Sequence, residues 1–141
     1  MKIRFFVVAL LAAGWAGAQP AGTAAQRAVV PLAPEEREHV LGEMRDFLTM
    51  LEQTASALAR GDFDAVAAAK PLGTGGEKGR MLPAIAGKLP AGFRAMARSA
   101  HEQIDALAAD AALRDLRRSL EQTGRLLQTC NACHAAYQFP K

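Results

Sequence analysis

An all-α fold, an antiparallel bundle of four helices, is what this sequence predicts, and three observations lead to it. The chain has 141 residues, the length of a single domain, and 50% of them are hydrophobic while only 6% are aromatic. Its core must therefore consist mainly of Ala and Leu, which favour helices. Apolar residues also recur at the three- and four-residue spacing of a helix face, whereas alternating runs are scarce. These patterns exclude a β-sandwich, a β-barrel and a nucleotide-binding α/β sheet.

The first residues have the pattern of an export signal. Lys2 and Arg4 precede an apolar run over residues 5–13, and Ala16-Gly17-Ala18 is a small-residue cleavage pattern. An uncleaved membrane anchor is the alternative, but it needs about 20 apolar residues, which is more than this run supplies. We predict that residues 1–18 are removed during Sec-dependent export to the bacterial periplasm.

Charge and hydropathy restrict the partners of the mature chain. Removal of the signal lowers the formal net charge from +3 to +1, and no stripe of Lys and Arg with interleaved aromatic residues remains. Nucleic acid is therefore not an expected partner. No later segment is apolar over the length that a membrane span requires, so we expect no span in the mature chain.

The mature chain divides into an arm and one domain. Residues 19–34 are rich in Ala, Gly, Pro and Thr without a sustained period, which predicts a flexible arm. The domain, residues 35–141, opens with a helix over residues 35–60. Pro34 and the acidic residues after it favour the start of this helix, and Gly61 favours its end.

Helical periodicity gives this first helix one apolar stripe, which we expect to pack on the other helices. At about 100° per residue, His39 and Met50 lie outside the stripe, and Met44 lies near its centre. The stripe consists of Val40, Leu41, Met44, Phe47, Leu48, Leu51, Ala55 and Leu58.

Three more helices are predicted to complete the bundle. Asp62 can cap the second helix, and four glycines make the following sequence, PLGTGGEKGR, a loop. The predicted bounds are 62–70 for the second helix, 71–80 for the loop, 81–89 for a loop or single turn, 90–109 for the third helix and 111–137 for the fourth.

Periodicity also predicts the buried sides of the last two helices. His101 flanks the stripe of the third helix, where we expect it to be a structural or surface residue. The stripe of the third helix consists of Phe93, Ala97, Ala100, Ile104, Leu107 and Ala108. The stripe of the fourth helix, which we expect to face the core, consists of Leu116, Leu120, Thr123, Leu127, Cys130 and His134.

The end of the fourth helix carries the C-x-x-C-H signature of c-type haem attachment, from Cys130 to His134. Two thiols three residues apart on a helix reach the two vinyl groups of one porphyrin and form thioethers. The adjacent His134 then offers an imidazole nitrogen to the iron. The motif predicts one haem c per chain, bound covalently by Cys130 and Cys133, with His134 as the proximal iron ligand.

Three other roles compete with haem attachment. A thioredoxin-like C-x-x-C belongs to a βαβ unit, which this sequence does not contain. A structural zinc site needs four Cys or His ligands, and the chain has no second closely spaced pair. A disulfide between Cys130 and Cys133 is the simplest alternative in an exported protein, but it leaves His134 unexplained.

The sequence resembles the cytochrome c′ family, the class II c-type cytochromes. Members of that family are exported four-helix bundles with the haem motif near the C-terminus and an aromatic residue after it, where this chain has Tyr137. Arg37 and the turn over residues 60–65 are further similarities. Members usually carry Arg or Lys after the aromatic residue, near the proximal histidine, whereas this chain has Gln138. Many such bundles dimerise through their first two helices, so a homodimer stays open for this chain.

The resemblance implies two candidates for the distal side of the iron. Some members place an apolar residue of the first helix there, and others place a Met sulfur. Counting forward from Arg37 puts Leu41 at this position, whereas counting back from Gly61 puts Met44 there. Met44 is nearer the centre of the stripe, and a thioether suits haem iron and raises its reduction potential. Met44 is therefore the candidate distal ligand, with ordinary core packing as its alternative role.

Three functions follow from these alternatives. With Met44 on the iron, the chain is expected to be an electron carrier that docks transiently with redox proteins. With Leu41 over an open position, it is expected to bind nitric oxide or carbon monoxide. Without haem, it is an exported helical scaffold or metal-binding bundle. We expect electron transfer and no enzymatic activity, because Ser99 and Ser119 have no persuasive base partner in the sequence.

Overall fold

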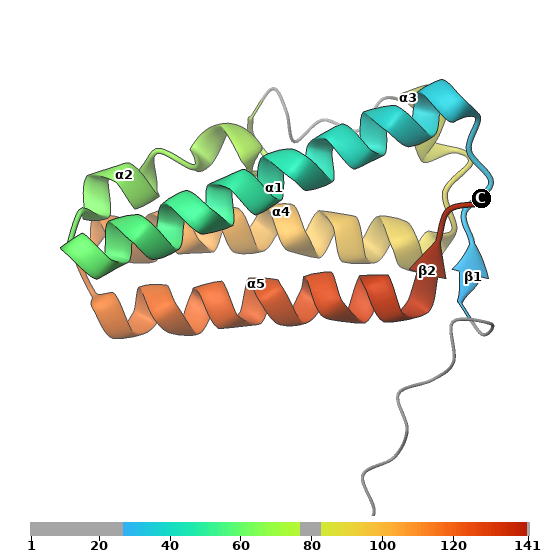
Figure 1. Ribbon diagram of the computed structural model, residues 1–141. Helices are drawn as coiled ribbons and strands as arrows, with labels where there is room; N and C mark the ends of the chain where they lie inside the picture. Colours follow the sequence, from blue (N-terminus) through green and yellow to red (C-terminus); the bar gives the residue numbers. More distant parts are fainter. Residues whose placement is uncertain (1–26, 77–82, 141) are drawn as a thin grey trace, which may run out of the picture.

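The computed structural model describes residues 27–76 and 83–140, so the predicted signal, residues 1–18, lies outside the described residues. Three long helices dominate, with short helical segments between the first and second of them (Figure 1). The element bounds are β1 Ala28–Val29, α1 Pro34–Arg60, α2 Phe63–Ala67, η2 Lys70–Leu72, α3 Pro83–Ala86, α4 Ala91–Ala112, α5 Leu116–Ala136 and β2 Tyr137–Gln138. The fold is all-α, as predicted. No described helix combines the length and the apolar character that a membrane crossing would need.

Local sequence determines both ends of α1. Glu36 accepts a hydrogen bond from the Ala33 N–H at 3.0 Å, immediately before Pro34 begins the helix. At the other end Gly61 has φ of 70°, in the left-handed region that glycine adopts without a steric cost. The predicted bounds of this helix therefore agree with the structure to within one residue.

The second predicted helix, residues 62–70, is shorter and divided in the structure. Asp62 caps α2 as predicted, since its carboxylate accepts a hydrogen bond from the Ala65 N–H at 3.1 Å. The helix then ends at Ala67, and the separate turn η2 contains Pro71, which has no N–H to donate. Short segments thus occupy the part of the chain where a full second helix was expected.

The boundary between the last two helices also differs from the prediction. The third helix was expected to end at residue 109 and the fourth to begin at residue 111, but α4 continues to Ala112 and α5 begins at Leu116. Asp115 determines this start, because its carboxylate accepts a hydrogen bond from the Arg118 N–H at 3.0 Å.

Figure 1 shows that α1 and α4 run in one direction and that α5 runs in the other. The start of α1 and the end of α5 therefore lie at the same end of the molecule. A hydrophobic cluster at this end, here called the end cluster, consists of buried Val30, Leu32, Val40, Ile85, Leu89 and Phe93, with half-buried Met44, Cys133, Tyr137 and Phe139 packed against it. A second cluster, here called the main core, consists of Met50, Ala57, Leu58, Val66, Ala100, Ile104, Leu107, Ala111 and Leu126.

The described part of the predicted flexible arm is built into the fold. β1 pairs in parallel with β2, with Ala28 opposite Tyr137 and Val29 opposite Gln138. Val30 is fully buried in the end cluster. The expectation of a flexible arm is therefore wrong for residues 27–33. Nothing in the sequence indicated this pairing, because β2 lies at the other end of the chain and local periodicity does not report contacts between distant segments.

The buried face of α1 is rotated away from its apolar stripe. Met50, which was expected outside the stripe, is only 5% exposed, whereas Leu48 inside the stripe is 69% exposed. The stripe of α5 departs from the prediction in the same way, because Leu120 and Leu127 are exposed and Leu126 is buried. The stripe predicted for α4 does lie in the interior, except that Ala97 is half-buried.

Polar residues of α5 are buried in place of the expected leucines, and their hydrogen bonds explain why they can be. The Ser119 hydroxyl donates to the Asp115 carbonyl at 2.9 Å. The Gln122 side-chain amide donates to the Gln103 carbonyl of α4 at 3.2 Å. Because these groups have partners, they can lie in the interior and leave the apolar stripe of α5 on another side.

Candidate functional site

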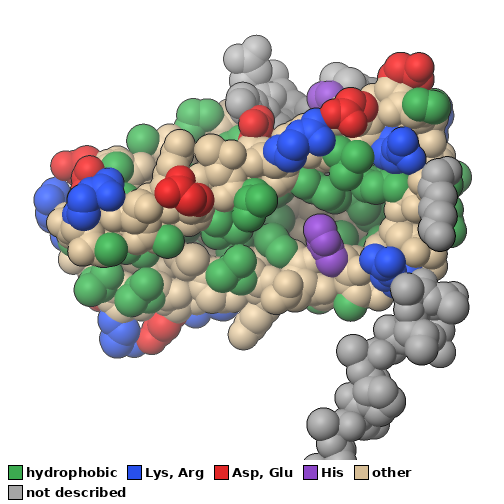
Figure 2. Space-filling view, viewed as in Figure 1, with side chains coloured by type: hydrophobic (Ala, Val, Ile, Leu, Met, Phe, Trp, Pro, Cys, Tyr) green, Lys and Arg blue, Asp and Glu red, His purple; other side chains and the backbone are tan. Residues whose placement is uncertain are grey.

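A pocket of about 400 Å³ lies between α1 and α5, on the face where hydrophobic side chains gather in Figure 2. Its walls come mainly from α1, α4 and α5, with Phe93 of α4 among them, and Ile85 of α3 completes the lining. The lining is largely apolar, and its volume is within the usual range for a small-molecule or cofactor site, roughly 300–1,000 Å³.

The apolar stripes of α1 and α5 face this pocket instead of the protein core. Leu41, Met44 and Leu48 line it from α1, and Leu127 and Cys130 line it from α5. Leu48 is 69% exposed and Leu127 is 44% exposed. Leucines that remain accessible on both walls of one pocket indicate a site that a large apolar ligand would cover.

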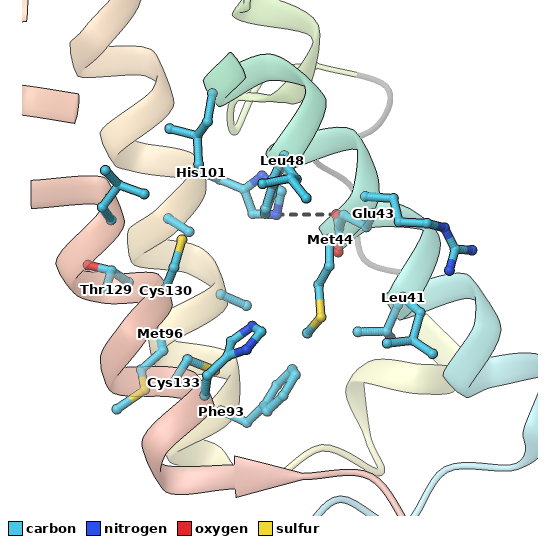
Figure 3. A pocket seen from close by; sticks show the side chains of 18 of the residues that line it. Leu41, Glu43, Met44, Leu48, Phe93, Met96, His101, Thr129, Cys130 and Cys133 are labelled. Carbon is cyan, nitrogen blue, oxygen red and sulfur yellow. Dashed lines mark ion pairs between the residues drawn. The ribbon is translucent and has the colours of Figure 1, made fainter. Parts of the chain in front are cut away.

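The two cysteines lie on the α5 side of the pocket (Figure 3). Both are free and half-buried. Burial raises the pKa of the Cys130 thiol and of the Cys133 thiol, and the proximity of Cys130 raises the pKa of Cys133 further. Catalytic C-x-x-C motifs depend on a lowered thiol pKa. The raised thiol pKa values therefore give no support to a thioredoxin-like role.

His134 lines the same pocket and is exposed to solvent. It follows Cys133 directly on α5, so the three motif residues occupy one end of one helix. Over residues 27–76 and 83–140 no three His, Cys, Asp or Glu side chains cluster in a way that could hold a metal ion. A zinc site made of protein ligands thus has no support among these residues.

Met44 lies across the pocket from the motif. Figure 3 shows its side chain extending from α1 into the space that faces Cys133, while Leu41 lies nearer the start of the helix. Met44 and Cys133 both pack against the end cluster. The structure therefore brings all four predicted site residues to one pocket, and it also places Leu41 in the lining. His39 is exposed at the same pocket.

His101 has a larger role in this pocket than the sequence suggested. Its ring is buried, with Nδ1 2.7 Å from the Leu72 carbonyl oxygen and Nε2 3.4 Å from Oε1 of Glu43, the pair dashed in Figure 3. The ring also meets Phe47 edge-on, with centroids 5.2 Å apart. Glu43 is the main cause that raises the pKa of His101. Periodicity could place His101 beside the buried stripe, but it could not identify partners on other elements.

Arg27, which the sequence did not single out, contacts the backbone of His134. Nη1 of Arg27 donates a hydrogen bond to the His134 carbonyl oxygen at 3.4 Å. The Gln138 side-chain amide donates to the Arg27 carbonyl oxygen at 3.2 Å. The segment before α1 is therefore tied to the end of the helix that carries the motif.

The residues of the pocket fit haem c. Two thiols three residues apart, the histidine that follows them and a thioether on the opposite helix are the donor set that haem attachment and iron ligation use. The apolar walls match the body of a porphyrin. Cys130 and Cys133 would hold the group, and His134 would bind its iron.

Comparisons with known proteins agree with this fit. A family model described as Cytochrome C′ matches residues 34–138, which is well over half of the chain. The matched segment begins with α1, ends with β2 and includes every residue of the C-x-x-C-H motif. Searches of curated proteins and of solved structures give no match. The chain therefore belongs to the cytochrome c′ family, a family of proteins with covalently bound haem c.

Proposed function

We propose that this chain is an electron carrier that holds one haem c and exchanges electrons with other redox proteins in the periplasm. When bound, haem c supplies an iron that alternates between ferric and ferrous states and so carries one electron. Cys130 and Cys133 would hold the group through thioethers, and His134 would provide the proximal ligand. The proposed role is that of a carrier and not of an enzyme.

The observation that carries this proposal is the position of Met44. Its thioether extends into the pocket from α1, opposite the helix that bears Cys133 and His134. Met44 would offer its sulfur to the iron as a second protein ligand, which would leave no open position for a gas or substrate. A thioether also raises the reduction potential, because it is a weak ligand that favours the ferrous state.

The rest of the pocket supports electron exchange in two ways. Phe93 and Val40 are buried behind it and exclude water, which favours the less charged redox state. The pocket opens to the molecular surface between Leu48 and Leu127, so an edge of a haem bound there would lie near the surface. A redox partner can therefore approach from that side through a small, transient interface.

Export belongs to the same proposal. We place the mature chain in the bacterial periplasm, with residues 1–18 as its cleaved signal. The family relationship supports this location, because covalent attachment of haem c is a property of exported cytochromes of this kind.

The test compares two methionines that line the same pocket. Met44→Ala should convert a low-spin ferric spectrum into a high-spin one, abolish the weak far-red band of sulfur ligation and allow rapid carbon monoxide binding. Met96→Ala is the matched control, because Met96 contributes a thioether to the lining from α4. It should leave the low-spin spectrum unchanged.

Two results would contradict the assignment of Met44 as an iron ligand. If the unmodified protein is high-spin and binds carbon monoxide readily, Met44 is a lining residue and gas binding replaces electron transfer as the function. Leu41, which lines the same wall, would then cover the open position. If Met96→Ala causes the conversion instead, the assignment of the ligand to α1 is wrong.

A further inference from the structure

We propose that residues 27–32, here called the N-terminal strap, form part of the haem site, in which Arg27 positions the last turn of α5 and places a positive charge beside His134. This inference rests on the proposed function, in which His134 is the iron ligand. It adds a positioning residue from a segment that lies outside the helical bundle and before the part of the chain that matches the family.

Hydrogen bonds tie the strap to the segment that directly follows the motif. β1 pairs with β2, and beyond the paired residues the Val30 N–H donates to the Gln138 carbonyl oxygen at 2.9 Å. Gln138 returns a bond, since its side-chain amide donates to the Arg27 carbonyl oxygen at 3.2 Å. Gln138 therefore holds the strap through both its backbone and its side chain, four residues after His134.

The bond from Arg27 acts on the helix end itself. The last four carbonyl groups of an α-helix have no partner within the helix. In α5 the Cys133 carbonyl accepts from the Tyr137 N–H, and the His134 carbonyl accepts from Nη1 of Arg27 at 3.4 Å. A cation at this position also interacts favourably with the negative end of the helix dipole. The strap thus supplies both a partner and a complementary charge to the turn that carries the iron ligand.

Apolar packing fixes the strap in place. Val30 is fully buried and Leu32 is 7% exposed, and both belong to the end cluster. Met44 of α1 and Cys133 of α5 pack against that same cluster. The strap is therefore anchored among the residues that support both walls of the pocket. For the last turn of α5 to move outward, the pairing of β1 with β2 would have to break.

This arrangement predicts an effect on the haem that a purely structural strap would not produce. A positive charge close to His134 disfavours the ferric state, which carries one more positive charge than the ferrous state. Arg27→Gln should therefore lower the reduction potential of the haem-loaded protein. Arg27→Lys, which keeps the charge, should retain most of the wild-type potential.

Arg37 offers a matched control for the charge. Its Nη1 donates to the Pro140 carbonyl oxygen at 2.8 Å, so it too connects the start of the chain to the C-terminal segment, but six residues beyond His134. Arg37→Gln removes the same charge and the same kind of bond. We expect the fall in potential for Arg27→Gln to be at least twice that for Arg37→Gln.

The second readout follows the strap itself. Amide hydrogen exchange in the haem-loaded full chain reports how often the hydrogen bond from the Val30 N–H to the Gln138 carbonyl oxygen breaks. Arg27→Gln and Gln138→Ala should each speed exchange of this amide by about tenfold or more, and Gln138→Ala should do so without removing a charge. Arg37→Gln should leave it within about twofold of the wild-type rate.

Three results would overturn the inference. Equal shifts of potential for Arg27→Gln and Arg37→Gln would mean that the charge acts only at long range. Unchanged potential in Arg27→Gln would remove Arg27 from the haem site. Unchanged exchange of the Val30 amide in both Arg27→Gln and Gln138→Ala would show that these bonds do not hold the strap. Failure of the wild-type chain to bind haem would instead refute the proposed function, and exchange of the Val30 amide would still decide whether the strap holds α5.

Discussion

Leu126 and Leu127 are neighbours on α5 that occupy opposite environments, and they provide a direct test of where the haem lies. Leu126 is 1% exposed and belongs to the main core, whereas Leu127 is 44% exposed and lines the pocket. Leu→Ala removes three carbon atoms, each of which contributes about 0.8 kcal/mol when buried. With the cavity left behind, Leu126→Ala should cost about 2–5 kcal/mol. The cost should be the same with and without haem.

Leu127→Ala should behave differently, because its cost depends on what covers the side chain. The protein atoms bury only about half of this residue, so without haem the variant should lose about 1.3 kcal/mol. Haem in the pocket would cover the rest and raise the cost by about 1 kcal/mol. Urea unfolding of each variant with and without haem measures all four values. A cost for Leu127→Ala that is equal in the two states would refute the placement of haem between α1 and α5.

Further predictions concern the scaffold and the motif. Gly61→Ala should lower the free energy of unfolding by about 1–2 kcal/mol, because Gly61 has φ of 70°. No neighbouring atom lies where a Cβ would be, so this cost reflects backbone strain alone. A neutral change would contradict the helix end described here. Glu43 raises the pKa of His101, so this pair stabilises the fold below the unfolded-state pKa of about 6.5 and its contribution is lost as pH rises through the raised value. Glu43→Gln should accordingly destabilise the protein more at about pH 6 than at about pH 9, and an equal loss at both would exclude the pair. His134→Ala should abolish the native ferrous spectrum while part of the covalent haem remains attached.

Features that depend on neighbouring residues could be predicted from the sequence. The start and end of α1 agree with the prediction, because capping by Glu36 and the left-handed Gly61 involve residues within one turn of the helix. The C-x-x-C-H motif is equally local, since its three functional residues lie on one helix end. The buried stripe of α4 was predictable because protein surrounds that helix on its apolar side.

The orientation of α1 and α5 could not be predicted in the same way. Periodicity identifies the side of a helix that avoids water, but it does not distinguish burial in protein from contact with a cofactor. Leu48 and Leu127 were therefore expected in the core, although they line the pocket. Met50 was expected outside the apolar stripe of α1, although Thr54 donates a hydrogen bond to its sulfur at 3.5 Å and both residues are buried.

Contacts between distant segments were also beyond the sequence. β1 contains two residues and is too short to show an alternating pattern, and its partner β2 follows α5 at the other end of the chain. The hydrogen bond from Arg27 to the His134 carbonyl oxygen likewise joins the segment before α1 to the end of α5. The same limit applies to His101, whose partners Glu43 and Leu72 come from other elements.

The mass of the denatured protein tests the central claim most directly. Thioether-linked haem survives denaturation, so a chain matured together with haem-attachment machinery should show the mass of the mature polypeptide plus one haem. The Cys130→Ser and Cys133→Ser double variant, produced in the same way, should show the polypeptide mass alone. A wild-type chain that lacks haem under these conditions, or that carries a disulfide between Cys130 and Cys133, would contradict the account.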